Sequence, residues 1–129
     1  MKHFIIVVII CALTGCSQDN FDNPTPQDLQ GTWIEVKSKT DTLTFNSVDG
    51  LNLMTLTRGK EIINGHLLPK KGSGPYEYKL KEEFISLYWM LSSNNTFNDY
   101  RLVFKGNKLT VDNFYDSTLN TSLTFDKIN

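Results

Sequence analysis

The feature that most constrains the fold is a short-range alternation of apolar and polar residues that begins at Gly31. Thr-Leu-Thr-Phe at 42–45, Tyr-Glu-Tyr-Lys-Leu-Lys at 76–81 and Ser-Leu-Thr-Phe at 122–125 all alternate with period two. This period is typical of a strand with one buried side and one solvent-facing side. Turn residues separate such segments about every ten residues, and Gly106-Asn107 is a strong hairpin signal. The sequence therefore predicts an all-β antiparallel sandwich or barrel.

The stretch from Leu80 to Leu91 fits two interpretations. Leucine and phenylalanine recur in it at the spacing of one helix face. Residues 84–90, however, are rich in strand formers and apolar on both faces. We predict a strand covered on both sides after a turn at 81–83, and a single helix remains the alternative. In such a strand Tyr88 points away from the core, and we expect a loop or a partner to cover it.

The N-terminus carries an export signal. Lys2 precedes an unbroken apolar run from Phe4 to Ala12, which has the length of a signal-peptide core and is too short to span a bilayer. Leu13-Thr14-Gly15-Cys16 resembles a bacterial lipobox. The resemblance implies that residues 1–15 are a lipoprotein signal peptide and that Cys16 receives acyl chains such as palmitate, which anchor the protein to a membrane. Cys11 lies in the removed segment, so no thiol remains for a disulfide or a nucleophile.

Residues 16–29 are expected to form a lipidated tether. Ser17 to Gln30 is polar and contains Pro24 and Pro26, a composition typical of an extended linker. We expect this tether to be dispensable for folding, and the domain to occupy residues 30–129. No Asp follows Cys16 directly. By resemblance to enterobacterial lipoproteins, this favours an outer-membrane lipoprotein that is periplasmic or surface-exposed.

The composition offers little for catalysis or for binding nucleic acid. His66 is the only histidine beyond the signal segment, and no catalytic triad can be proposed from it. Glu82 and Glu83 would point to opposite faces of a strand, and residues 112–116 lack the spacing of a calcium loop. Without Lys2, 13 − 1 = 12 basic side chains face 14 acidic ones, and they form no basic stripe. We therefore expect no enzyme, no metal, no cofactor and no nucleic-acid partner.

The stretch Leu29-Gln30-Gly31-Thr32-Trp33, with residues 104–111 and 113–115, resembles the small lipocalin-like lipoproteins of Bacteroidetes. The resemblance implies a small antiparallel up-and-down barrel of about eight short strands, in which Gly-x-Trp opens the first strand. In that family the tryptophan plugs the closed end and often stacks on a basic side chain near the last strands.

The alternation in the first strand adds its own expectation. It puts Trp33 on the face of Glu35, opposite Ile34 and Val36. If Ile34 and Val36 face the core, Trp33 must sit at a barrel end or beside a bulge. Arg101 alternates against apolar neighbours and is expected to point outward, so a stacked pair of Trp33 and Arg101 is not expected.

A barrel of this size is either filled by its own side chains or holds one small ligand, and the many aromatic residues favour a filled interior. The side chains predicted to point inward are Tyr76, Tyr78, Leu80, Ile85, Leu87 and Trp89. If a cup exists, Tyr76, Tyr78 and Trp89 are its expected wall, and a small apolar or amphipathic ligand is the expected partner.

The alternative function is a protein-binding module of the cell envelope. It would be an inhibitor, an immunity factor or an accessory subunit of an outer-membrane complex. The candidate surface is the loop from Ser92 to Asp99, which carries Phe97 at its middle.

Two tripeptides resemble the O-glycosylation sites of exported Bacteroides proteins. They are Asp41-Thr42-Leu43 and Asp116-Ser117-Thr118. The resemblance implies that Thr42 and Ser117 are candidate acceptors of a glycan.

Overall fold

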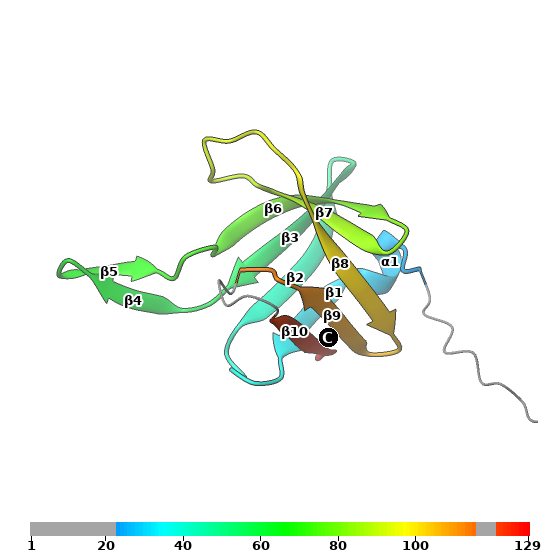
Figure 1. The fold of residues 1–129 in the computed structure, drawn as a ribbon, viewed down its shortest axis with the longest axis horizontal. Coiled ribbons are helices and arrows are strands. Elements are labelled where there is room, and N and C mark those ends of the chain that lie inside the picture. The colour runs from blue at the N-terminus through cyan, green and yellow to red at the C-terminus, as the bar shows by residue number, and fades with distance from the viewer. Residues whose placement is uncertain (1–22, 116–120) are drawn as a thin grey trace, which may run out of the picture.

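The computed structural model describes residues 23–115 and 121–129, and these residues form an all-β domain (Figure 1). The barrel strands are β1 (Gly31–Glu35), β2 (Thr42–Val48), β3 (Leu51–Thr57), β6 (Gly74–Lys81), β7 (Phe84–Trp89), β8 (Asn98–Lys105), β9 (Lys108–Asp112) and β10 (Ser122–Lys127). A short helix, α1 (Pro26–Leu29), precedes them. A separate two-stranded sheet, β4 (Lys60–Ile63) and β5 (His66–Pro69), is inserted between β3 and β6.

The eight barrel strands form a closed antiparallel barrel in the order β1-β10-β9-β8-β7-β6-β3-β2. Each strand pairs with the next barrel strand along the chain, which is the up-and-down arrangement that the lipocalin-like interpretation predicts. The barrel closes between β1 and β10, where Trp33 lies opposite Lys127 and Glu35 lies opposite Phe125. The predicted fold class is therefore confirmed, and of the two predicted architectures the barrel is the correct one.

Residues 80–91 form strands, so the helical alternative is wrong. β6 and β7 pair with Lys81 opposite Phe84, and Glu82-Glu83 forms the turn between them. The side chains of Ile85 and Leu87 are buried and those of Leu80 and Trp89 pack against the core, as expected. The inward row ends at Trp89, because Leu91 lies beyond the end of β7 and is exposed.

In β1 the side chains of Trp33 and Glu35 point inward, and not those of Ile34 and Val36, which the sequence alone allows to be core-facing. Trp33 is fully buried and Glu35 is 3% exposed, whereas Ile34 and Val36 lie on the outer side and are half-buried. Trp33 pairs with Leu43 of β2, whose side chain is also fully buried. With this face inward the large indole is fully buried, while Ile34 and Val36 still keep part of their burial on the outer side.

The end of the expected tether is part of the fold. Pro26–Leu29 is one helical turn whose N-cap is Thr25; Thr25 and Asp28 form a reciprocal capping box. Leu29 is fully buried, and the Nε1 of Trp33 donates a hydrogen bond to the carbonyl oxygen of Leu29 at 2.8 Å. The extended segment predicted from the proline content is therefore wrong for residues 26–29.

The Gly-Thr-Trp motif has a steric reason at its glycine. Gly31 has φ +117°, and a Cβ added there would overlap the backbone oxygen of Asn129. The Nζ of Lys127, in the last strand, lies 5.3 Å from the centre of the Trp33 ring. A basic side chain of β10 thus lies near the Trp33 ring, and Arg101 is exposed as predicted.

The barrel has two unlike ends. At one end lie α1, the tight turns after β2, β6 and β8, and the end of β10; we call it the closed end. At the other end lie the loop after β1, the β4–β5 insertion, the loop after β7 and residues 113–115 after β9; we call it the mouth. Among residues 23–115 and 121–129, no helix has the length and apolarity needed to cross a bilayer.

Candidate functional site

The mouth contains a pocket of about 330 Å³. Its walls come from the start of β6, the end of β7, the start of β8, the residues just before β6, and the segment after β9. Below it, the barrel interior is filled with buried side chains, among them Phe45, Tyr78 and Phe125. The barrel is therefore filled in its lower part and hollowed at its mouth. The volume of the pocket lies at the lower end of the range for small-molecule sites.

Aromatic rings form the apolar wall of the pocket. Tyr76 and Trp89 are cross-strand neighbours on β6 and β7, and their rings are stacked at 6.4 Å with an angle of 22°. Phe114 packs edge-on against Tyr76 at 5.5 Å and against Tyr100 at 5.2 Å. Such a cluster offers flat apolar faces to a ligand, and each ring is held by its neighbours.

Two side-chain hydrogen bonds fix this wall to the chain before β6. The hydroxyl of Tyr76 donates to the carbonyl oxygen of Gly72 at 2.6 Å. The Nε1 of Trp89 donates to the carbonyl oxygen of Ser73 at 3.2 Å. Because both polar tips are already bonded to backbone, the rings are preorganised and present their apolar faces to the pocket.

The rim of the pocket is polar. Lys71 contributes an exposed ammonium on one side, and Asn94, Thr96 and Asn98 contribute amide and hydroxyl groups from the loop after β7 and the start of β8. The pocket thus combines an apolar floor with hydrogen-bonding groups and one cation at its edge. An amphipathic molecule fits this arrangement better than a purely apolar one.

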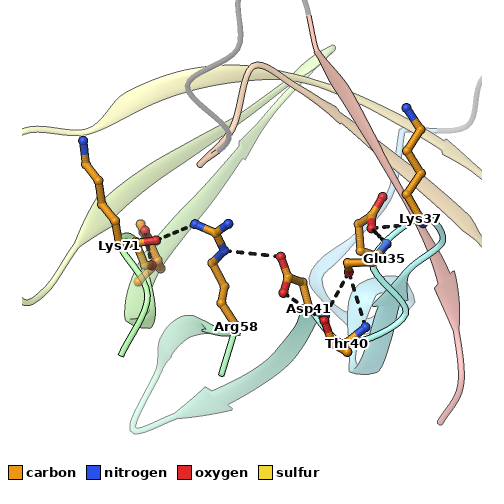
Figure 2. A network of polar contacts seen from close by, with 9 residues as sticks. Glu35, Lys37, Thr40, Asp41, Arg58 and Lys71 are labelled. Carbon is orange, nitrogen blue, oxygen red and sulfur yellow. Dashed lines mark hydrogen bonds and ion pairs between the residues drawn. The ribbon is translucent and has the colours of Figure 1, made fainter. Parts of the chain in front are cut away.

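A charged network supports the same end of the barrel (Figure 2). The Nε of Arg58 lies 3.3 Å from the Oδ2 of Asp41, and its Nη1 donates to the carbonyl oxygen of Lys71 at 2.8 Å. The guanidinium also lies over the ring of Tyr115, 4.4 Å from its centre. Arg58 therefore joins the start of β2 to two residues that line the pocket, Lys71 and Tyr115.

Glu35 belongs to the same end and organises the loop after β1. Its Oε2 accepts hydrogen bonds from the backbone N–H of Lys37, at 3.0 Å, and from that of Ser38. The hydroxyl oxygen of Ser38 in turn accepts from the N–H of Asp41 at 3.1 Å. These bonds explain how a carboxylate occupies an inward position of β1, because backbone donors replace the water it loses.

Burial raises the pKa of the pocket tyrosines further above neutral pH. Loss of hydration raises the pKa of Tyr76 to about 12 and also raises the pKa of Tyr100. For Tyr115, burial and then the negative charge of Asp41 raise the pKa of the phenol. Neutral phenols serve as hydrogen-bonding groups and flat surfaces, and none of these three is activated as a base or a nucleophile.

The loop from Ser92 to Phe97 is held against the outside of β7. The ring of Phe97 lies 5.6 Å from that of Tyr88, and the Nζ of Lys79 lies 4.3 Å from the centre of the Phe97 ring. The hydroxyl of Tyr88 donates to the Oδ1 of Asn95 at 2.9 Å. The chain itself thus covers part of Tyr88, which is half-buried. The prediction of a strand covered on both sides is wrong for Phe84, which is exposed. The same loop supplies part of the pocket rim.

The structure brings two of the three predicted ligand-binding residues together. Tyr76 and Trp89 line the pocket. Tyr78 lies beneath it, 1% exposed and packed edge-on against Phe45 at 5.3 Å, so it belongs to the core. Thr42 is half-buried in β2, whereas Cys16 and Ser117 lie outside the described residues.

The sequence interpretation missed Arg58, Asp41 and Phe114. Phe114 follows β9 and reaches the pocket only because the barrel closes, so no local pattern marks it. A usable signal did exist for the polar network, since Glu35 shares an alternation face with Trp33. No cluster of metal-ligating side chains occurs within the part of the chain that the structure describes, and His66 is exposed on β5.

Comparison with protein-family models, curated proteins and solved structures finds no match for the chain. The functional interpretation therefore depends on the geometry of the pocket and on the residues of the chain itself.

Proposed function

We propose that this chain is a membrane-anchored lipocalin-like lipoprotein that binds a small amphipathic ligand at the mouth of its barrel and does not convert it. The observation that carries the proposal is the pocket of about 330 Å³ in which stacked aromatic rings lie below a polar rim. A preorganised aromatic floor favours a flat apolar group, because the rings lose little conformational entropy when the ligand binds.

The rim specifies the polar part of the ligand. Lys71 places a positive charge at the edge of the pocket, and the loop after β7 adds neutral amides and hydroxyls. We therefore propose a ligand with a flat or short apolar body and a polar or anionic head. The apolar body would cover Trp89 and Phe114, and the head would remain near the rim where water can reach it.

The membrane anchor in this proposal is Cys16. Its support is the lipobox-like Leu13 to Cys16 after an apolar run. Acyl chains on Cys16 would hold the domain at an outer membrane, on the periplasmic side or at the cell surface. The residues between Cys16 and Thr25 would then set the distance between the membrane and the barrel.

A dye-binding titration tests the ligand proposal. The protein from Ser17 onward contains every described element, and anilinonaphthalene sulfonate has the proposed flat body and anionic head. We expect saturable binding to one site that Trp89→Ala weakens at least about tenfold, as loss of a central aromatic contact does in other sites. Phe84→Ala is the matched control, because Phe84 lies on the same strand but is exposed near the closed end.

The ligand proposal fails if the folded protein shows no saturable binding. It also fails if Trp89→Ala and Phe84→Ala bind the dye equally well while both melt cooperatively. Lys71→Glu tests the contribution of the polar head. It should weaken binding of the anionic dye and leave binding of a neutral naphthylamine unchanged.

The second candidate is the protein-binding envelope module, and the ordered loop after β7 favours it. Phe97 is half-buried between Tyr88 and Lys79, so the loop presents a fixed outline to a partner. Phe97→Ala discriminates the two proposals. In a protein-binding module, this change would abolish partner binding while dye binding persisted. In a ligand-binding barrel, it would change dye binding only as far as it alters the pocket rim.

A further inference from the structure

The β4–β5 hairpin, residues 60–69, projects away from the barrel as an arm (Figure 1). Its two strands pair with each other in a sheet separate from the barrel, and all eight strand residues are exposed. Four of those residues are large and apolar. Their exposures are Ile62 74%, Leu67 62%, Ile63 43% and Leu68 43%.

The apolar side chains occupy both faces of the arm. Ile62 and Leu67 are directly cross-strand, so they share one face. Ile63 and Leu68 each follow one of these residues, and because side chains alternate along a strand they lie on the other face. A protein that docks on one face leaves the other in water, whereas a lipid interface surrounds both.

Positive charge gathers where the arm joins the barrel. Residues 58–71 contain four basic side chains (Arg58, Lys60, Lys70 and Lys71) and one acidic side chain (Glu61), so their formal charge is 4 − 1 = +3. Arg58 is ion-paired with Asp41, and the other four side chains still carry 3 − 1 = +2. The whole chain carries −1, which leaves −1 − 3 = −4 for all other residues. The arm therefore combines an apolar end with a basic base, as segments that bind anionic membrane surfaces do.

A second copy of the chain is a weaker explanation for the exposed arm. Stable protein interfaces use about 20–30 residues on each partner. The arm offers four large apolar side chains spread over two faces. Such a surface is small for a dimer but sufficient for shallow insertion into lipid, where each buried methylene group contributes.

We infer that the arm inserts into the headgroup region of a bilayer that contains anionic phospholipid. Its insertion is shallow, because the outer edges of β4 and β5 carry backbone groups that need water and open sheet edges do not enter the hydrocarbon core. Lys60 at the base of the arm and Lys71 just beyond it are exposed and reach the phosphates. Lys71 also lines the pocket, so insertion turns the mouth of the barrel toward the membrane.

Vesicle binding by the protein from Ser17 onward tests this inference, because that protein carries no acyl chain. The probes are vesicles of phosphatidylcholine alone and vesicles with equal parts of phosphatidylglycerol, with bound protein measured by co-sedimentation. We expect binding to the anionic vesicles only, weakened by salt. The double change Ile62→Ser and Leu67→Ser should reduce the affinity about 10- to 100-fold.

The closed end supplies a matched control. Val48 and Leu51 are also a cross-strand pair, each 46% exposed, at the turn between β2 and β3. The double change Val48→Ser and Leu51→Ser should alter vesicle affinity by less than about twofold, since that end faces away from the membrane. Both double variants should melt cooperatively. Trp89→Ala should bind the dye more weakly but bind vesicles as the unmodified protein does, which separates this inference from the ligand proposal.

Three outcomes overturn the inference. The first is an unmodified protein that does not bind anionic vesicles. The second is an equal loss of binding in the two double variants. The third is a protein that sediments as a dimer and becomes monomeric after the change at Ile62 and Leu67, which would assign the arm to a second copy.

Discussion

Replacing Leu29 by alanine should destabilise the barrel strongly, although Leu29 belongs to a segment whose composition suggests a tether. Its side chain is fully buried at the closed end, directly beside Trp33 in the core. Burial of a leucine side chain is worth about 1.5–3 kcal/mol, and the cavity left behind adds to that loss. Leucine-to-alanine changes in cores cost about 2–5 kcal/mol, and we expect about 3 kcal/mol here.

A point substitution tests this contribution better than a truncation. Removing residues 23–29 would also remove the entropy cost of ordering α1, about 1–2 kcal/mol for each residue. A protein that begins at Gln30 should therefore lose less stability than the buried area of Leu29 suggests. The truncation also removes the carbonyl oxygen of Leu29, which accepts a hydrogen bond from the Trp33 indole N–H at 2.8 Å. Water at the opened end partly compensates for this loss.

The assay is urea denaturation of the protein from Ser17 onward, followed by circular dichroism. For a domain of about 100 residues, a loss of 3 kcal/mol lowers the melting temperature by roughly 12–24 °C. Gln27→Ala is the control, because Gln27 is exposed on the same helical turn and its side chain is not part of the capping box of Thr25 and Asp28. If Leu29→Ala stays within about 0.5 kcal/mol of the control, the closed end does not depend on α1 and our reasoning is wrong.

Three further predictions concern other parts of the chain. Gly31→Ala should cost more than about 1 kcal/mol, since alanine at φ +117° is strained and its Cβ overlaps Asn129; thermal melting checks it. Cys16→Ser in the full chain should give protein that no longer partitions into detergent, and unchanged partitioning would refute lipidation at this residue. Burial raises the pKa of Tyr78 from 10.0 to about 12, so its stabilising effect is complete below pH 10 and is lost as the pH rises toward 12. Tyr78→Phe should therefore flatten the fall of the unfolding free energy across that interval, and an unchanged slope would contradict the assignment.

The barrel could be predicted from the sequence because its strands are locally consistent. Alternation in 76–81 and the Gly106-Asn107 turn each specify a strand or a hairpin without reference to the rest of the chain. The strand at 84–89 was also predictable, since β-branched and aromatic residues there outweigh a helical spacing. Each of these signals acts over a few residues. The barrel closes when the strands that they specify pair in chain order.

Tyr76 and Trp89 could be predicted as part of the pocket wall, but the complete pocket could not, because it depends on contacts between distant segments. The arm is a local hairpin, and what the sequence did not show is that its sheet stays apart from the barrel. Phe114 and Tyr76 are far apart in sequence and meet only in the closed barrel. Residues 61–68 include four large apolar side chains, yet the structure leaves them all exposed. The face of β1 was also ambiguous, since Trp33 and Glu35 share it and a carboxylate ordinarily indicates the outer side.

The ion pair at the mouth is better explained by positioning than by stability. Asp41 is 6% exposed, and the attraction between two such charges in a protein interior is largely offset by their loss of hydration. A pair of apolar residues could fill the same space at similar stability. An apolar pair, however, could not replace the two contacts of the Arg58 guanidinium. This group lies over the ring of Tyr115, and its Nη1 donates to the carbonyl oxygen of Lys71. Because Arg58 immediately precedes Gly59 and the arm, this one side chain fixes the pocket wall and the point at which the arm leaves the barrel, and that geometric role is what an isosteric apolar replacement would lose.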